Sequence, residues 1–145
     1  MSKFGEFSLP THFHLLPLIR EYLPDSLAPA DQALRARALA CAMDEHAYNL
    51  TVQRMGEEAR ASQDVSGLMS IMKLVHTEQE REKFEVLLDA LGYRALGWES
   101  DQFSTQEQAI TRAWLNSFAL TISGGASEVQ LNVIAKRVLG LPEAK

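Results

Sequence analysis

The apolar residues of this chain recur at helical spacing between short segments rich in proline, glycine and serine. Residues 1–12 are mixed in character and predict no element. Phe13–Tyr22 predicts a short helix with Pro17 near its start, and Pro24-Asp25-Ser26 predicts the break that ends it. The chain therefore divides into an uncommitted N-terminal segment, residues 1–12, and a helical domain, residues 13–142.

A long second helix is predicted from Asp31, a suitable N-cap residue, to about Ser62. One stripe of this helix is apolar and rich in small residues, and Arg54 closes it; its members are Ala36, Leu39, Met43, Ala47 and Leu50. Because alanine side chains are small, we expect a neighbouring helix to approach this stripe closely.

A third helix is predicted to start at Asp64 or Ser66 and to end at Gly92, a common helix C-terminal residue. The polar run Glu78–Lys83 interrupts its apolar stripe, and we interpret this run as a solvated face. The apolar positions of the stripe are Leu68, Met72, Val75, Phe84, Leu87, Leu88 and Leu91.

The C-terminal third of the chain carries two patterns typical of helix starts. After a loop over residues 92–103, Ser104 with Glu107 predicts a capping box for a helix that carries Ile110, Trp114, Phe118 and Leu120. Gly124-Gly125 breaks the chain. Ser127 with Gln130 predicts a second capping box, and a last helix then runs to Leu139 before Gly140 and Pro142.

These elements predict an all-α fold. The sequence has no strand pattern and no internal repeat, and 145 residues are typical of one domain. Three to four long antiparallel helices with short connections indicate an up-down helical bundle. Cys41, the single cysteine, lies in an alanine-rich apolar run and is interpreted as a small buried side chain.

The net charge excludes one class of partner. The chain carries a formal charge of −5 and its 14 basic residues are scattered, which argues against nucleic acid as a partner. It has no apolar stretch near the ~20 residues that span a bilayer, and its N-terminus has no signal-peptide pattern. We therefore expect a cytoplasmic protein without membrane contact.

The sequence gives little support for a di-iron site, a hydrolase nucleophile elbow or a catalytic carboxylate pair. A di-iron bundle needs Glu-x-x-His, and neither His46 nor His76 has a glutamate three positions earlier. The segment 125–129 lacks the final glycine of a nucleophile elbow and has no strand before it. Asp44 and Glu45 are adjacent on a helix and point in different directions. We predict no metal site and assign no catalytic residue.

The glycine pair at Gly124 and Gly125 joins two predicted helices. Glycine permits a positive φ and close backbone approach, and the helix start that follows presents free N–H groups. Such groups favour an anionic or polar ligand. The spacing is equally typical of a tight helix–helix turn with a good cap, and by itself it does not decide between the two.

The wider sequence of this region resembles a known family. Residues 122–142 read Ile-Ser-Gly-Gly-Ala-Ser-Glu-Val-Gln-Leu-Asn-Val-Ile-Ala-Lys-Arg-Val-Leu-Gly-Leu-Pro. This run is similar, without gaps, to the closing signature of the acyl-CoA dehydrogenase family. Upstream, Ser70-x-x-Lys73 and the helix end Leu87–Gly92 also resemble that family. The resemblance extends over residues 13–142 and is strong only after Trp114.

The resemblance implies a flavoprotein context. Members of the family have a helical N-terminal domain, a small β-domain and a C-terminal four-helix domain, and FAD and the acyl-CoA thioester lie between the last two. They are oxidoreductases that catalyse α,β-dehydrogenation of an acyl-CoA. This chain then corresponds to the C-terminal domain, incomplete alone, which frames FAD and takes part in a homo-oligomer or a hetero-oligomer with another dehydrogenase-type chain.

The resemblance also assigns candidate cofactor-binding residues. Three match the turn beside the flavin and thioester, and three match the helix start beside FAD; in order they are Gly124, Gly125, Ala126, Ser127, Glu128 and Gln130. Many members have the catalytic glutamate where this chain has Gly124, so the resemblance supplies no catalytic base. Ala126 and Leu131 replace the usual threonine and arginine, and Asp89 stands near a glutamine that other members place on a neighbour's cofactor.

The sequence leaves two alternatives open. One is a non-catalytic helical binding or scaffold module derived from the family, which the missing base at Gly124 motivates. The other is part of a flavin monooxygenase of the same fold. The sequence specifies neither the acyl chain nor the size of the oligomer.

Overall fold

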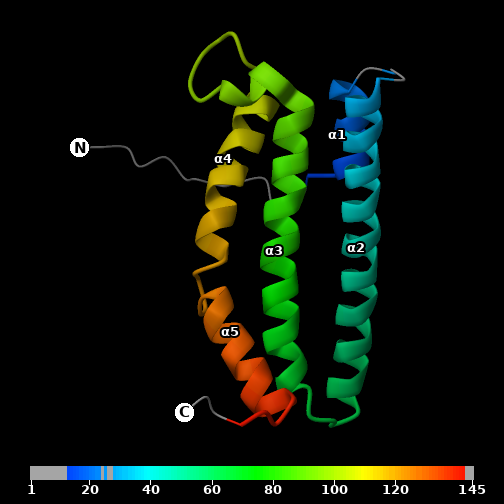
Figure 1. Ribbon diagram of the computed structural model, residues 1–145, viewed down its shortest axis with the longest axis vertical. Helices are drawn as coiled ribbons and strands as arrows, with labels where there is room; N and C mark the ends of the chain where they lie inside the picture. Colours follow the sequence, from blue (N-terminus) through cyan, green and yellow to red (C-terminus); the bar gives the residue numbers. More distant parts are fainter. Residues whose placement is uncertain (1–12, 24, 26–27, 143–145) are drawn as a thin grey trace, which may run out of the picture.

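The computed structural model describes residues 13–23, 25 and 28–142, and all of the regular secondary structure within these residues is helical (Figure 1). The all-α prediction is confirmed; residues 1–12 lie outside the described part. The five α-helices are α1 (Leu15–Tyr22), α2 (Pro29–Arg60), α3 (Ser66–Leu91), α4 (Thr105–Leu120) and α5 (Ser127–Val133). A 3-10 helix, η1 (Gly92–Leu96), follows α3, and a π-helix, η2 (Ile134–Val138), follows α5.

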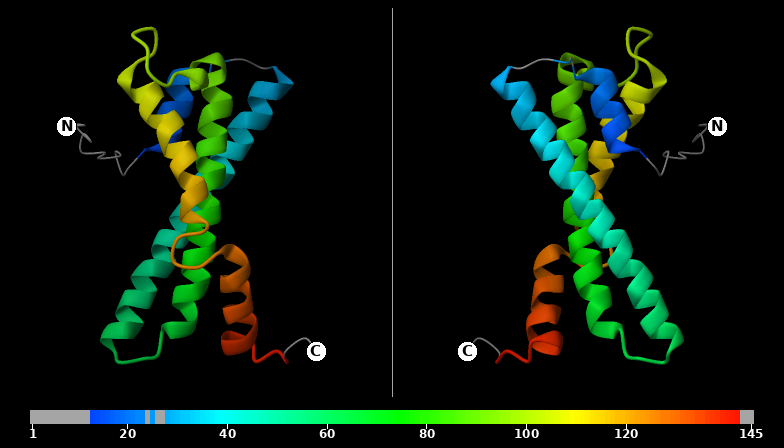
Figure 2. Two further views of the ribbon diagram at one scale, coloured as in Figure 1. Left: turned by 90° about the vertical axis from the view of Figure 1, so that its left-hand side faces the viewer. Right: turned by 90° about the vertical axis from the view of Figure 1, so that its right-hand side faces the viewer.

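The helix α3 lies at the centre of the bundle. It contacts every other α-helix, whereas α1 packs on α2 and α3 and contacts α4 through hydrogen bonds from Gln106 to Glu21 and Tyr22 (Figures 1 and 2). The chain runs down α2, back up α3, and down again along α4 and then α5. The predicted up-down course is therefore correct, but its third arm is divided between two helices.

The short helix α1 covers one end of the bundle. Pro17 is accommodated within its first turn, where a helix needs no N–H donor. Leu15, Leu18 and Ile19 share the inner face and are buried. They belong to one apolar core with Leu23, the C-cap of α1, and with residues from α2, α3 and α4: Ala38, Phe84, Val86, Leu87, Leu91, Ile110 and Ala113.

The helix α2 starts earlier than predicted. Its first residue is Pro29 and its N-cap is Ala28, so Asp31 lies in the first turn and is not the cap. Proline suits a first helical position because its fixed φ is already helical and its missing N–H is not required there. Asp31 still places a negative charge near the positive end of the helix dipole.

No described helix covers the apolar stripe predicted on α2. Leu39, Met43 and Leu50 are 54%, 64% and 53% exposed, and the buried residue of α2 is Ala38. The helix is regular, but its contact with α1 and α3 lies on another side. The expectation that a neighbouring helix lies on this stripe is therefore not met within the chain. We call Ala36, Leu39, Met43, Ala47 and Leu50 the α2 stripe.

The polar run Glu78–Lys83 of α3 is not the solvated face that was predicted. Each of its residues is buried or half-buried, and Lys83 is only 8% exposed. Lys83 forms ion pairs with Glu80 and, at 3.8 Å, with Glu45 of α2. On the same side Glu82 accepts from Arg37 of α2 at 2.9 Å. The run is polar because α2 and α3 meet there through ion pairs.

The predicted capping box of α4 is confirmed. The Ser104 hydroxyl accepts from the N–H of Glu107 at 3.2 Å, and the Ser104 N–H donates to the Glu107 carboxylate at 2.7 Å. Arg94 of η1 donates to the same carboxylate at 2.7 Å. Hydrogen bonds from Arg94 and Ser104 lower the pKa of Glu107, which is 2% exposed. The loop over residues 92–103, which includes η1, is thereby joined to α4.

The last helix continues as a π-helix before it ends. The N–H of Leu139 donates to the carbonyl of Ile134 at 3.0 Å, five residues earlier. Gly140 then takes a φ of +62°, as glycine does after many helices. None of the helices in the described part of the chain is long and apolar enough to cross a membrane.

Candidate functional site

The turn between α4 and α5 is held by backbone hydrogen bonds within its own residues and with the end of α4. The N–H groups of Ile122 and Ser123 donate to the carbonyl of Ala119, and the N–H of Gly125 donates to the carbonyl of Ile122 at 3.2 Å. Gly124 and Gly125 take φ values of +68° and +104°. Both values lie in the region that L side chains rarely adopt, which explains why glycines occupy these two positions.

The side chain of Lys73 holds this turn against α3. Its ammonium donates to the carbonyl of Gly125 at 2.6 Å and lies 3.4 Å from the carbonyl of Thr121. Thr121 is the C-cap of α4, and Gly125 lies two residues before the start of α5. One half-buried lysine therefore contacts both sides of the turn.

The second predicted capping box is wrong. Ala126 is the N-cap of α5, and Ser127 is already the first helical residue. The Ser127 hydroxyl donates to the carboxylate of Glu78 on α3 at 2.7 Å. The Gln130 amide donates backwards to the carbonyl of Gly124 at 3.0 Å. Ser127 therefore fixes the start of α5 against α3, and Gln130 fixes the turn. The two residues do not form a capping box.

The two glycines differ in the space around them. A Cβ built on Gly125 would lie 2.8 Å from Nε2 of Gln130, whereas a Cβ on Gly124 would meet no atom within 4 Å. Gly124 is exposed, and Gln130 is 9% exposed. Gly124 therefore presents bare backbone to solvent. At Gly125 a side chain is disfavoured for two reasons, the positive φ and the Gln130 amide that fills the adjacent space.

The six candidate residues lie together on this turn and the first turn of α5. Gly125, Ala126 and Ser127 are half-buried, Gln130 is buried, and Gly124 and Glu128 are exposed. Sequence reasoning did not assign two residues that hold them, Lys73 and Glu78, both from α3. The resemblance at Ser70-x-x-Lys73 pointed to Lys73 without a role. Glu78 had no signal, because it falls within the run interpreted as a solvated face.

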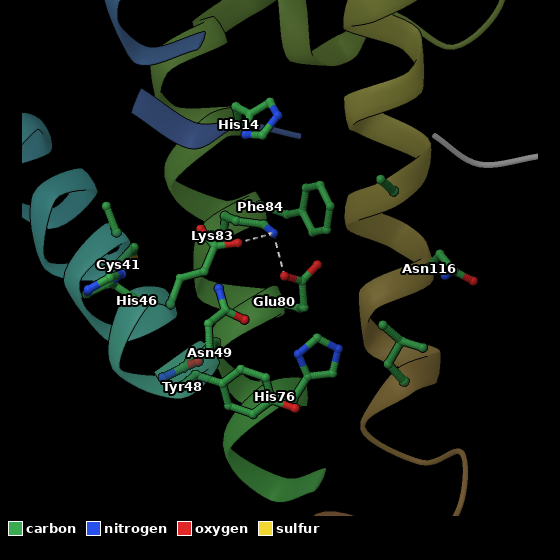
Figure 3. Close-up of a pocket in the computed structure, with 15 residues that line it drawn as sticks. His14, Cys41, His46, Tyr48, Asn49, His76, Glu80, Lys83, Phe84 and Asn116 are labelled. Atoms are coloured by element: carbon green, nitrogen blue, oxygen red, sulfur yellow. Dashed lines mark hydrogen bonds and ion pairs between the residues drawn. The ribbon is translucent and has the colours of Figure 1, made fainter. Parts of the chain in front are cut away.

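A separate groove of about 780 Å³ lies between α2 and α4, with α3 as its floor (Figure 3). His76 of α3 stacks on Tyr48 of α2, with ring centroids 5.3 Å apart. The ammonium of Lys83 lies between the carboxylates of Glu45 and Glu80. Burial and the nearby Glu80 raise the pKa of Tyr48. Five of the ionisable side chains of this groove are therefore engaged with one another: Lys83 with Glu45 and Glu80, and Tyr48 with His76.

Cys41 lies at the edge of this groove and is half-buried, not the fully buried side chain that was predicted. Burial and the carboxylate of Glu82 raise the pKa of its thiol, although Arg37 opposes this effect. A raised pKa keeps the thiol protonated and therefore poorly nucleophilic. Across the described residues, no group of three or more histidine, cysteine, aspartate and glutamate side chains is arranged to hold a metal ion.

Comparison with known proteins assigns the family. The sequence profile of the acyl-CoA dehydrogenase C-terminal domain matches residues 25–139. The chain is 35% identical over 126 residues to acyl-CoA dehydrogenase IpdE1 of Mycolicibacterium smegmatis. The aligned residues cover 87% of this chain and 26% of that protein. It is 33% identical over 130 residues to IpdE1 of Mycobacterium tuberculosis, with 89% of this chain and 28% of that protein covered.

A third relative is acyl-CoA dehydrogenase FadE34 of Mycobacterium tuberculosis, 31% identical over 90 residues, which cover 62% of this chain and 11% of that protein. No solved structure matches the chain. The chain spans about a quarter of the length of the two IpdE1 relatives. The profile match, the relatives and the all-helical fold agree. The chain belongs to the acyl-CoA dehydrogenase family and corresponds to the C-terminal helical domain of that family.

Proposed function

We propose that this chain frames FAD as part of an acyl-CoA dehydrogenase that carries out α,β-dehydrogenation of an acyl-CoA. The observation that carries the proposal is the turn over residues 121–126, a backbone structure that three side chains hold in place. Lys73 and Gln130 each donate to a carbonyl of the turn, and Ser127 donates to α3. A turn built in this way is pre-organised, so little ordering is required when a ligand binds.

The residues of the turn fit a planar, polar group. Gly124 is exposed and has free space beside its backbone, and Ala126 is small, so a flat ring system can approach the main chain. In this proposal Gly124, Gly125 and Ala126 lie against the ring system, and Ser127, Glu128 and Gln130 lie beside the cofactor. FAD bound there would accept the hydride of the dehydrogenation. The acyl-CoA thioester would lie on the same side of the turn.

The α2 stripe supports the oligomer half of the proposal. It is an apolar helix face left uncovered by the described chain, and exposed apolar faces of this kind are typical of protein–protein contacts. We assign it to contact with a second copy or with another dehydrogenase-type chain. Changing Met43, which is 64% exposed, to glutamate would abolish this contact without disturbing the core.

One observation favours a second candidate function. Gly124 stands where many members of the family carry their catalytic glutamate, and its exposed backbone bears no side chain at all. The chain then serves as a binding or scaffold module that holds a cofactor or partner without supplying a base. Electron-acceptor-dependent oxidation of an acyl-CoA by an assembly that contains this chain would exclude that candidate.

The proposal is tested by titrating the purified chain with FAD. Visible absorbance reports bound flavin, and size-exclusion chromatography of the wild type and of Met43→Glu reports the oligomer. We expect flavin to migrate with the protein, and we expect the wild type to elute as a larger species than Met43→Glu. Free flavin at every concentration would contradict the cofactor role. A wild-type chain that stays monomeric at high concentration and associates with no dehydrogenase-type chain would contradict the oligomer role.

A further inference from the structure

The two peptide groups of the glycine turn are fixed by different contacts. The peptide between Gly124 and Gly125 is held at both ends, because Gln130 donates to the Gly124 carbonyl and the Gly125 N–H donates to Ile122. The next peptide, between Gly125 and Ala126, receives its hydrogen bond from Lys73 at 2.6 Å. The orientation of this second peptide therefore depends on a side chain from α3.

The contact with Lys73 has a geometric consequence on the opposite side of the turn. The carbonyl and the N–H of a trans peptide point in opposite directions. Because the Gly125 carbonyl points toward α3 and Lys73, the N–H of Ala126 points away from α3. The direction of this peptide is set by ψ of Gly125 and by φ of Ala126, which is −57°. Because glycine leaves ψ loosely restricted, the hydrogen bond from Lys73 fixes the direction of the Gly125 carbonyl and, with it, that of the Ala126 N–H.

We infer that Lys73 is a positioning residue, which turns the Ala126 N–H outward as a hydrogen-bond donor to the polar edge of the flavin. The inference rests on the proposed function, in which the flavin lies against this turn. An ammonium suits the task because charge-assisted hydrogen bonds are stronger than neutral ones. Its second contact, 3.4 Å from the carbonyl of Thr121, holds the end of α4 at the same point. Lys73 acts through the backbone of the turn and need not touch the cofactor.

The test uses three variants of the purified chain. Lys73→Met keeps the length of the side chain and removes the donor, while Lys73→Arg keeps charge and donors. Leu87→Ala is the matched control, because Leu87 is fully buried on the same helix, 14 residues away, and its loss lowers stability without removing a contact to the turn. Without ligand, NMR measures the carbonyl ¹³C shift of Gly125 and the amide ¹⁵N shift of Ala126. With FAD, flavin absorbance measures affinity.

We expect both shifts to move in Lys73→Met and to return toward wild type in Lys73→Arg, with no change in Leu87→Ala. We also expect FAD affinity to fall about tenfold or more in Lys73→Met, to recover in Lys73→Arg and to be kept in Leu87→Ala, from the usual strength of a charge-assisted hydrogen bond. Unchanged shifts in folded Lys73→Met would overturn the inference. Equal FAD affinity of wild type and Lys73→Met would overturn it as well.

The two proposals fail separately. A wild-type chain that binds no FAD overturns the proposed function and, with it, the ligand side of this inference. A wild-type chain that binds FAD, together with a Lys73→Met chain whose turn is unaltered, overturns only the role of Lys73. If Lys73→Met and Leu87→Ala lose affinity equally at equal loss of stability, Lys73 is a structural residue and the inference is again wrong.

Discussion

Replacing Gly125 with alanine tests the geometry of the turn most sharply. A Cβ at this position would lie 2.8 Å from Nε2 of Gln130, and the backbone φ is +104°. The strained backbone costs about 2–3 kcal/mol for an L residue. Displacing the Gln130 amide from the Gly124 carbonyl costs about 1 kcal/mol more. We therefore expect Gly125→Ala to lower the free energy of unfolding by about 3–4 kcal/mol.

Gly124→Ala is the matched control. Its φ of +68° lies in the left-handed helical region, and its Cβ would meet no atom within 4 Å. We expect a loss of about 1 kcal/mol, from backbone strain alone. Guanidinium unfolding followed by circular dichroism measures the free energies of wild type and both variants under the same conditions.

A double-mutant cycle with Gln130→Ala then isolates the clash. Removing the Gln130 side chain removes its contact with the new methyl group, so Gly125→Ala should cost about 1 kcal/mol less in that background than in the wild type. Equal losses for the two glycine variants, together with additive effects in the cycle, would refute this reasoning. Gln130 would then not occupy the space beside Gly125.

Three further predictions concern the rest of the bundle. Leu87→Ala should lower the free energy of unfolding by about 2–5 kcal/mol, measured by chemical denaturation, because Leu87 is fully buried; a loss below 1 kcal/mol would place it outside the core. Arg94 and Ser104 lower the pKa of Glu107, so its stabilisation should be complete above the ordinary glutamate pKa of about 4.3 and should disappear as the pH falls through the lowered value. Glu107→Gln should remove that acid dependence, and an unchanged pH–stability profile would contradict the assignment. Ser127→Ala should lower the free energy of unfolding by about 1 kcal/mol through loss of the bond to Glu78, with Ser123→Ala as an exposed control in the same turn.

Local signals predicted those parts of the fold that local chemistry determines. Ser104 and Glu107 form the predicted capping box because both partners lie within one helical turn. Gly92 ends α3 and the glycine pair separates α4 from α5, because positive φ values leave little alternative to glycine. The resemblance at residues 122–142 indicates the family without any geometry, because it is a long ungapped run.

The incorrect predictions depended on contacts between helices. The run Glu78–Lys83 was interpreted as a solvated face because ion pairs with α2 are not visible in a single helix's pattern. The α2 stripe has helical spacing, but the spacing does not reveal which helices lie on it. Ser127 has the spacing of a cap, yet the turn places Ala126 there and directs the serine to Glu78. Lys73 likewise reaches the turn from 52 residues earlier in the chain.

The most direct test of the central claim is an FAD titration of the ¹⁵N-labelled chain, followed residue by residue by NMR. We expect amide shift changes concentrated at Gly124–Gln130, with the groove residues Tyr48 and His76 unaffected. Absence of any shift at high FAD concentration, or shifts centred on the groove between α2 and α4, would contradict the claim that this turn frames the flavin.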